Sequence, residues 1–220
     1  MSLPINFPKI YIVHYKKLIQ RKQNLINQFK QFNITNYEFI EDYDRNEINL
    51  TEIDTYFHPN YNNNVRKGEE LIIKCINMSH LKIYNKILET QDNIFLILED
   101  DAILNDNFPA LLTRYMESLP TDMDIACINN GCNLHISPNQ IKPNQIWYKT
   151  SATRTCCGYL ITKSCCEQLI KTIIPFQNAI DHELNRQITI NNFNVYWCEP
   201  TIIQDGSETI YKSSRESREN

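Results

Sequence analysis

The stretch Ile94-Phe-Leu-Ile-Leu-Glu-Asp-Asp101 decides the fold that we predict for this chain. Five apolar residues lead directly into three carboxylates, Glu99, Asp100 and Asp101. A short apolar run with β-branched and aromatic members is typical of a strand buried on both faces, near the centre of an α/β sheet. Open α/β sheets bind ligands beyond the carboxyl ends of their strands, which is where these acids stand. The sequence therefore predicts a binding site at this strand end.

The three acids indicate a bound cation, because neighbouring carboxylates repel one another and are costly to desolvate. Oxygen donors with no cysteine or histidine close by suit a hard ion, Mg²⁺ or Mn²⁺, which commonly bridges substrate phosphates. Alternate residues of a strand share one face, so we expect Glu99 and Asp101 to contact the metal. A solvated strand end that feeds a turn is the alternative interpretation.

Strand and helix patterns alternate along the whole chain, which favours an α/β domain with a mostly parallel central sheet flanked by helices. The first strand–helix–strand unit, over residues 9–15, 18–32 and 37–42, predicts parallel pairing through a right-handed crossover. Further strands are expected at 124–129, 146–150, 158–162 and 194–198, and further helices at 69–89, 108–119, 164–173 and 181–190. We expect one domain over residues 1–212 and a polar tail over 213–220.

Composition excludes several classes of protein. The 220 residues carry a net charge of −4 with no sustained basic stripe, so nucleic acid is not an expected partner. No apolar window reaches the ~18 residues of a membrane span, and no signal peptide is evident, so we expect a cytoplasmic protein. The eight cysteines are expected to be reduced and buried. Abundant Asn, Ile, Lys and Tyr resemble coding from an AT-rich genome, such as that of some bacteria, protists or large DNA viruses.

Neither a phosphate-binding P-loop nor a G-x-G-x-x-G dinucleotide motif is present. Several segments instead resemble, in the right order, those of glycosyltransferase family 25, which contains lipopolysaccharide β-galactosyltransferases and procollagen galactosyltransferases. The resemblance extends from Lys9 to Ile210. Its segments are Ile12-Val-His-Tyr15 with Arg21, Phe39-Ile-Glu-Asp42, Ser79-His-Leu-Lys-Ile-Tyr84, the acid strand, Gly158-Tyr-Leu-Ile-Thr-Lys163, Ile180-Asp-His182, and Glu199-Pro200 through Gln204 and Ser207.

This resemblance implies a GT-A-type fold, a UDP-sugar donor, a divalent ion such as Mn²⁺ and inversion at the anomeric carbon. Galactose or glucose is the sugar that the family suggests. The acceptor would be a hydroxyl of a glycan, a lipid-linked oligosaccharide or a collagen-like hydroxylysine. A metal clamped on the nucleotide diphosphate would stabilise the charge that develops as the glycosidic bond breaks.

The resemblance also assigns a catalytic pair. Inversion by single displacement needs a base on the acceptor hydroxyl, and Asp181 matches the family's Asp-His pair. His182 would orient Asp181 or contact the acceptor. An N-cap at the start of the following helix is the alternative for Asp181, since Asp commonly serves there.

Five further residues are assigned to the donor. Asp42, at the end of the second strand, would hydrogen-bond the uracil or the ribose, and Arg21 would support that pocket. His14 stands in for the family's Asn, His80 would lie near the active site, and Asp100 would bind the donor. Surface, capping or helix-packing roles are the alternatives for Asp42, Arg21 and His80.

Tyr43 replaces the glycine that usually follows the second strand's Asp. Two other departures bear on nucleotide affinity and acceptor choice: Gly68-Glu69 lies about one helical turn too early to match the family's Gly-Glu-x-Gly-Cys turn before Ser-His, and Ser207-Glu208 replaces Ser-Asp. Two other functions remain open. One is a degenerate glycosyltransferase-like domain that binds sugar or scaffolds partners without turnover, and the other is a Mg²⁺-dependent phosphohydrolase.

Overall fold

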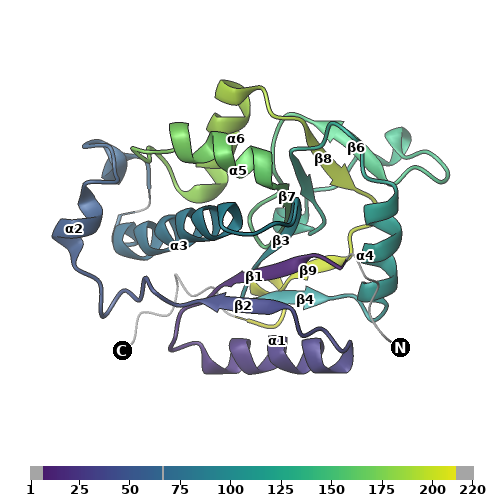
Figure 1. Cartoon of the computed structure of the whole chain (residues 1–220), viewed down its shortest axis with the longest axis horizontal. Helices are drawn as coiled ribbons and strands as arrows, with labels where there is room; N and C mark the ends of the chain where they lie inside the picture. Colours follow the sequence, from purple (N-terminus) through teal and green to yellow (C-terminus); the bar gives the residue numbers. More distant parts are fainter. Residues whose placement is uncertain (1–6, 66, 212–220) are drawn as a thin grey trace.

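The computed structural model describes residues 7–65 and 67–211, so the polar tail expected at 213–220 lies outside the described residues. A seven-stranded sheet runs through the molecule in the order β2-β1-β3-β7-β5-β8-β6, and helices cover both of its faces (Figure 1). Five of its strands run in one direction and two, β6 and β7, run in the other. The predicted α/β fold with a mostly parallel sheet flanked by helices is confirmed.

The sheet strands are β1 (Lys9–Val13), β2 (Tyr37–Ile40), β3 (Ile94–Glu99), β5 (Ile125–Cys127), β6 (Trp147–Thr150), β7 (Gly158–Thr162) and β8 (Val195–Cys198). The helices are α1 (Ile19–Gln31), α2 (Leu50–Asp54), α3 (Glu70–Leu88), α4 (Phe108–Glu117), α5 (Lys163–Thr172) and α6 (Ile180–Asn191). As predicted, β1 pairs in parallel with β2, and α1 forms the connection between them.

Strand β3 is buried on both faces, as its apolar run predicts. Each side chain from Phe95 to Leu98 is 0% exposed. Phe95 and Ile97 belong to the core shared with α3, α5 and α6, whereas Leu96 and Leu98 belong to the core shared with α1 and α4. Burial of one such side chain stabilises the fold by about 1.5–3 kcal/mol, so this run anchors both layers.

Two features of the topology were not predicted. β7 is inserted antiparallel between β3 and β5, so the sheet is not a simple series of parallel crossovers. A separate two-stranded sheet joins β4 (Ala102–Leu104) to β9 (Ile203–Asp205) in antiparallel register. These three-residue strands are too short to carry a periodic pattern, and β9 contributes Asp205 to the site described below.

The described residues contain no helix with both the length and the apolar character that crossing a membrane requires.

Candidate active site

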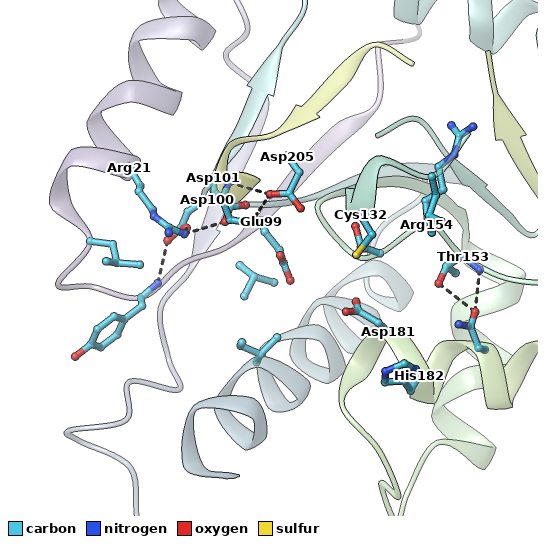
Figure 2. A pocket seen from close by; sticks show the side chains of 18 residues that line it. Arg21, Glu99, Asp100, Asp101, Cys132, Thr153, Arg154, Asp181, His182 and Asp205 are labelled. Carbon is cyan, nitrogen blue, oxygen red and sulfur yellow. Dashed lines mark hydrogen bonds and ion pairs between the residues drawn. The ribbon is translucent and has the colours of Figure 1, made fainter. Parts of the chain in front are cut away.

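A cavity of about 470 Å³ opens beyond the carboxyl ends of β1 and β3, where Val13 and Glu99 line it (Figure 2). This is the end of the sheet at which the sequence predicts a site. The cavity brings together six of the predicted site residues, which come from α1, the end of β3 and α6. They are Arg21, Glu99, Asp100, Asp101, Asp181 and His182.

The acid turn, residues Glu99 to Asp101, connects β3 to β4. Strand β3 ends at Glu99, and the next two acids lie in a turn. The expectation that Glu99 and Asp101 share a strand face is therefore wrong in its premise, because β-sheet alternation stops before Asp101. The geometry of this turn instead follows from the hydrogen bond, 3.0 Å long, that Gly206 N donates to Asp101 O.

Arg21 holds the two aspartates of the acid turn. Its Nη1 donates to Asp100 Oδ1 at 3.1 Å and to Asp101 Oδ2 at 2.9 Å, and all three side chains are buried. Burial and the neighbouring Asp100 raise the pKa of Asp101 to about 7, although the Arg21 guanidinium opposes the rise. Burial lowers the pKa of Arg21, but attraction to Asp100 and Asp101 outweighs this and raises it overall. The turn thus concentrates negative charge that one arginine only partly offsets.

Asp100 is anchored on its other side by His14. The Nδ1 of His14 lies 2.6 Å from Asp100 Oδ2, which also accepts a 3.4 Å hydrogen bond from Tyr15 N. The His14 side chain is buried and lies among Asp100, Glu41 and the Phe39 ring, not on the cavity wall. His14 is thus placed to orient Asp100, and its predicted direct contact with the donor stays a prediction.

Two residues that lie close to the acid turn, Asp205 and Cys157, were not predicted from the sequence. One donor atom from each, together with a carboxylate oxygen of Asp101, forms a group whose members all lie within 4.8 Å of one another. Pairing of β4 with β9 places Asp205 opposite Ala102, and the junction of β3 with β7 lets Glu99 N donate to Cys157 O at 3.1 Å. The premise that no cysteine is near the acids is therefore wrong, because it counted distance along the chain only.

The opposite wall of the cavity is the first turn of α6, which carries Asp181 and His182 (Figure 2). The residue that caps α6 is Ala179, so the alternative in which Asp181 is the N-cap is wrong. Burial, reinforced by the nearby Asp181 carboxylate, raises the pKa of the Cys156 thiol well above its ordinary value. Asp181 lines the cavity.

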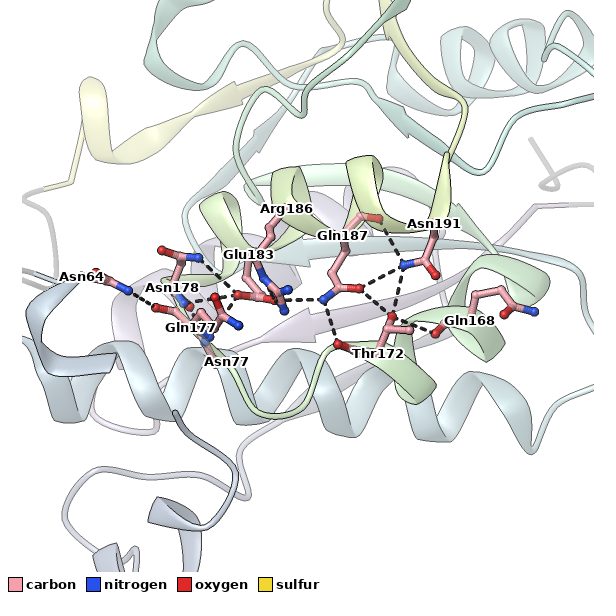
Figure 3. A network of polar contacts seen from close by, with 10 residues as sticks. All are labelled: Asn64, Asn77, Gln168, Thr172, Gln177, Asn178, Glu183, Arg186, Gln187 and Asn191. Atoms are coloured by element: carbon pink, nitrogen blue, oxygen red, sulfur yellow. Dashed lines mark hydrogen bonds and ion pairs between the residues drawn. The ribbon is translucent and has the colours of Figure 1, made fainter. Parts of the chain in front are cut away.

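Glu183 fixes the entry to α6 (Figure 3). Its side chain is 0% exposed, and its Oε2 accepts from the amides of Gln177 and Asn178 at 3.1 and 3.2 Å. Its Oε1 accepts from Arg186 and Gln187. A buried carboxylate that receives several hydrogen bonds holds the backbone around it, which here is the segment leading into Asp181.

Besides His14, two other predicted donor residues lie outside the cavity lining. Asp42 forms an ion pair of 2.6 Å with Lys82, and its side chain is 46% exposed. His80 is 0% exposed inside the core, where Nδ1 lies 2.9 Å from the Tyr159 hydroxyl and burial lowers the pKa of the imidazole to about 3. His80 packs α3 against β7, so the helix-packing alternative describes its surroundings.

The charge of the cavity is strongly negative. Five carboxylates line it, and both arginines that line it already bind acids: Arg21 as above, and Arg154 through a buried ion pair with Glu199. The Arg154 guanidinium also donates to Cys198 O at 2.8 Å. The carboxylates are Glu99, Asp100, Asp101, Asp181 and Asp205.

Comparison with known proteins shows the class of protein to which this chain belongs. Its fold is similar to that in the crystal structure of a glycosyltransferase involved in the glycosylation of the major capsid of PBCV-1, with a TM-score of 0.51 and 12% identity. The similarity covers 94% of this chain and 95% of that one. The model of glycosyltransferase family 25 (LPS biosynthesis protein) matches residues 7–184. The chain belongs to this family, as the motif resemblance predicts.

Two curated relatives match shorter regions. The protein named "Putative glycosyltransferase R655" of Acanthamoeba polyphaga mimivirus is 29% identical over 127 residues, which cover 57% of this chain and 38% of that protein. The protein named "Putative cysteine ligase BshC" of Staphylococcus haemolyticus is 25% identical over 151 residues, which cover 67% of this chain and 26% of that protein. The aligned regions thus span well under half the length of either relative.

Proposed function

We propose that this glycosyltransferase transfers a hexose, galactose or glucose, from a UDP-sugar to an acceptor hydroxyl, with inversion at the anomeric carbon. The observation that carries the proposal is the arrangement of carboxylates on two facing walls of one cavity. One wall is the acid turn with Asp205, and the other is Asp181 on α6. A metal-bound donor diphosphate on the first wall and an acceptor hydroxyl at the second would enclose the anomeric carbon between them.

The residues of the first wall fit a divalent ion, Mn²⁺ or Mg²⁺. Asp101 is only 7% exposed, and among the described residues its Oδ1 has no hydrogen-bond partner, which leaves a buried oxygen for a cation. Asp101 and Asp205 would hold the ion, and Glu99 would contact the ion or the ribose. When bound, the ion would neutralise negative charge on the leaving nucleotide diphosphate.

The paired state of both cavity arginines supports metal dependence. A diphosphate that entered a cavity lined by five carboxylates would meet like charge, and neither arginine is free to neutralise it. A bound cation would offset the negative charge of the acid turn and would also allow an anionic donor to bind there.

Asp181 would act as the general base. It would take the proton of the acceptor hydroxyl as that oxygen attacks the anomeric carbon, while the bond to the nucleotide diphosphate breaks on the opposite face. The Glu183 network would hold the segment that leads into Asp181, and the exposed His182 would contact the acceptor. The acceptor remains a glycan, a lipid-linked oligosaccharide or a hydroxylysine.

The nucleotide would extend from the acid turn toward Tyr15. A small, mostly apolar hollow beside the main cavity shares Tyr15 and Ile76 with it and is also lined by Tyr43 and Arg45. An aromatic lining of this kind suits a nucleobase face. Asp42 would reach the uracil or ribose only after leaving its ion pair with Lys82.

The test is a panel of UDP-sugars and GDP-sugars, with Mn²⁺, Mg²⁺ or EDTA, scored for nucleotide release and for thermal stabilisation. We expect release of UDP from one hexose donor, dependent on the metal and lost in Asp101→Asn and Asp205→Asn. Asp106→Asn, at an exposed acid of the β4–α4 connection, is the matched control. Stabilisation without release would indicate a binding domain, and phosphate release without donor preference would refute the proposal.

A further inference from the structure

Cys157 lies behind the acid turn, immediately before β7. Its side chain is 0% exposed, and its backbone carbonyl accepts the hydrogen bond of 3.1 Å from Glu99 N. This bond connects the residue directly to the first member of the acid turn. Its Sγ and the carboxylates of Asp101 and Asp205 all lie within 4.8 Å of one another.

The Cys157 thiol is buried beside two acids, since its Sγ lies within 4.8 Å of a carboxylate oxygen of Asp101 and of Asp205. The buried Asp101 Oδ1, which lacks a hydrogen-bond partner in the described part of the chain, is a second and independent sign that this group is arranged for a cation.

The spacing agrees with coordination of one ion. Metal–sulfur and metal–oxygen bonds of about 2.3 and 2.1 Å place tetrahedral donors roughly 3.6 Å apart. The three donors are within 4.8 Å of one another, so contraction by about 1 Å through small side-chain rotations is sufficient. Cys157 directly precedes β7, the acid turn follows the neighbouring strand β3, and Asp205 ends β9, so paired strands hold all three residues.

We propose that Cys157 Sγ is a third protein ligand of the metal held by Asp101 and Asp205, so that the site favours thiophilic divalent cations such as Zn²⁺, Co²⁺ or Cd²⁺ over Mg²⁺. On binding, the S–H bond breaks, the sulfur–metal bond forms, and the thiol proton passes to solvent. A thiolate ligand shifts metal preference toward these softer ions, whereas an all-oxygen set suits Mg²⁺ and Mn²⁺. The inference rests on the proposed function only in placing a metal at the acid turn.

The test is a Co²⁺ titration of the full chain, followed by absorption spectroscopy. Bound Co²⁺ with a thiolate ligand gives a near-ultraviolet sulfur-to-cobalt charge-transfer band, which an all-oxygen site lacks. We expect the band in a Cys132→Ser background, chosen because Cys132 is exposed and lines the cavity. The band should vanish on the further change Cys157→Ser and persist with Cys156→Ser, the adjacent buried thiol.

A second measurement keeps the inference testable if Cys157→Ser folds poorly, as judged by circular dichroism. Cd²⁺ added to the Cys132→Ser chain, in which Cys157 is intact, should give a near-ultraviolet thiolate-to-cadmium charge-transfer band, and Cd²⁺ that binds without this band overturns the inference. Cobalt that binds without the band, or a band that survives Cys157→Ser, overturns the inference. Metal-dependent UDP release without the band would leave the proposed function intact, so the two failures are distinguishable.

Discussion

Gly206 N donates a hydrogen bond of 3.0 Å to Asp101 O, and this contact connects the turn after β9 to the acid turn after β3. The approach is so close that a Cβ on residue 206 would lie 2.3 Å from Asp101 O and 2.8 Å from Cδ2 of Tyr211. Only a residue without a Cβ fits between these atoms. The positions of Asp101 and Asp205 thus depend on a glycine that neither sequence pattern nor chemistry singles out.

Gly206→Ala should weaken metal binding, because the new methyl group must push Asp101 away from Asp205. Overpacking of this kind typically costs about 1–3 kcal/mol. We expect a lower melting temperature and at least tenfold weaker Mn²⁺ binding, measured by calorimetry. Ile210→Ala, at a side chain that is 64% exposed in the same segment, should change neither quantity. Unchanged Mn²⁺ affinity in Gly206→Ala would show that the contact does not position the acids.

Arg21→Ala should destabilise the protein and make its stability depend on metal. Removal of one partner from a buried ion pair typically costs about 3–5 kcal/mol, because the remaining charges are left uncompensated. Asp100 and Asp101 would then repel each other, and an added cation would offset the loss. Urea unfolding with and without Mn²⁺ measures both effects. Arg21→Lys, which keeps the charge, should lose less, and equal stability of all three chains would contradict the prediction.

Asp181→Asn should abolish sugar transfer while Mn²⁺-dependent UDP binding is retained, because an amide cannot accept the acceptor proton. Loss of a general base typically lowers kcat by about 10²–10⁴-fold. Steady-state kinetics and UDP calorimetry on the same preparation separate the two properties. Loss of UDP binding together with transfer would indicate a structural role for Asp181.

Glu183→Gln tests whether the base is positioned by the network behind it. The neutral amide keeps the size of the side chain but weakens the contacts to the amides of Gln177 and Asn178 and to Arg186. We expect kcat to fall while KM for the donor changes little, because the donor wall is untouched. Glu183→Asp should recover part of the rate. Equal losses in kcat and in donor binding would point to general unfolding of α6.

Features that follow from a pattern within one helix or strand could be predicted from the sequence. The run Phe95 to Leu98 predicts a strand buried on both faces, because apolar residues on both sides of a pleat need cover on both sides. The alternation of strands with helices predicts the layered α/β fold in the same way. The acids after Glu99 predict the end of the sheet at which the cavity lies.

Features made by tertiary pairing could not be predicted. Cys157 and Asp205 reach Asp101 only because β7 runs antiparallel beside β3 and because β4 pairs with β9. Both residues are distant from the acid turn in the sequence, so their proximity to it is not evident there. The three-residue strands β4 and β9 are also too short to show a periodic pattern. His80 shows the converse, since its place in a family-like motif suggests the site while its helix directs it into the core.

His80 provides a prediction about pH. Burial lowers the pKa of its imidazole to about 3 in the folded protein, below the value of about 6.5 in an unfolded chain. Between these two values the unfolded chain binds a proton that the folded chain does not, so the free energy of unfolding falls as pH decreases. The contribution approaches about 1.4 kcal/mol per pH unit.

Urea unfolding between about pH 6 and about pH 4.5 should therefore give a shallower pH slope for His80→Gln than for the unmodified chain. His182→Gln, at an exposed histidine, controls for the loss of one imidazole. Equal slopes of unfolding free energy against pH in the unmodified chain and in His80→Gln would show that folded His80 takes up a proton as readily as an unfolded chain does. Its burial and its contact with Tyr159 argue against that outcome.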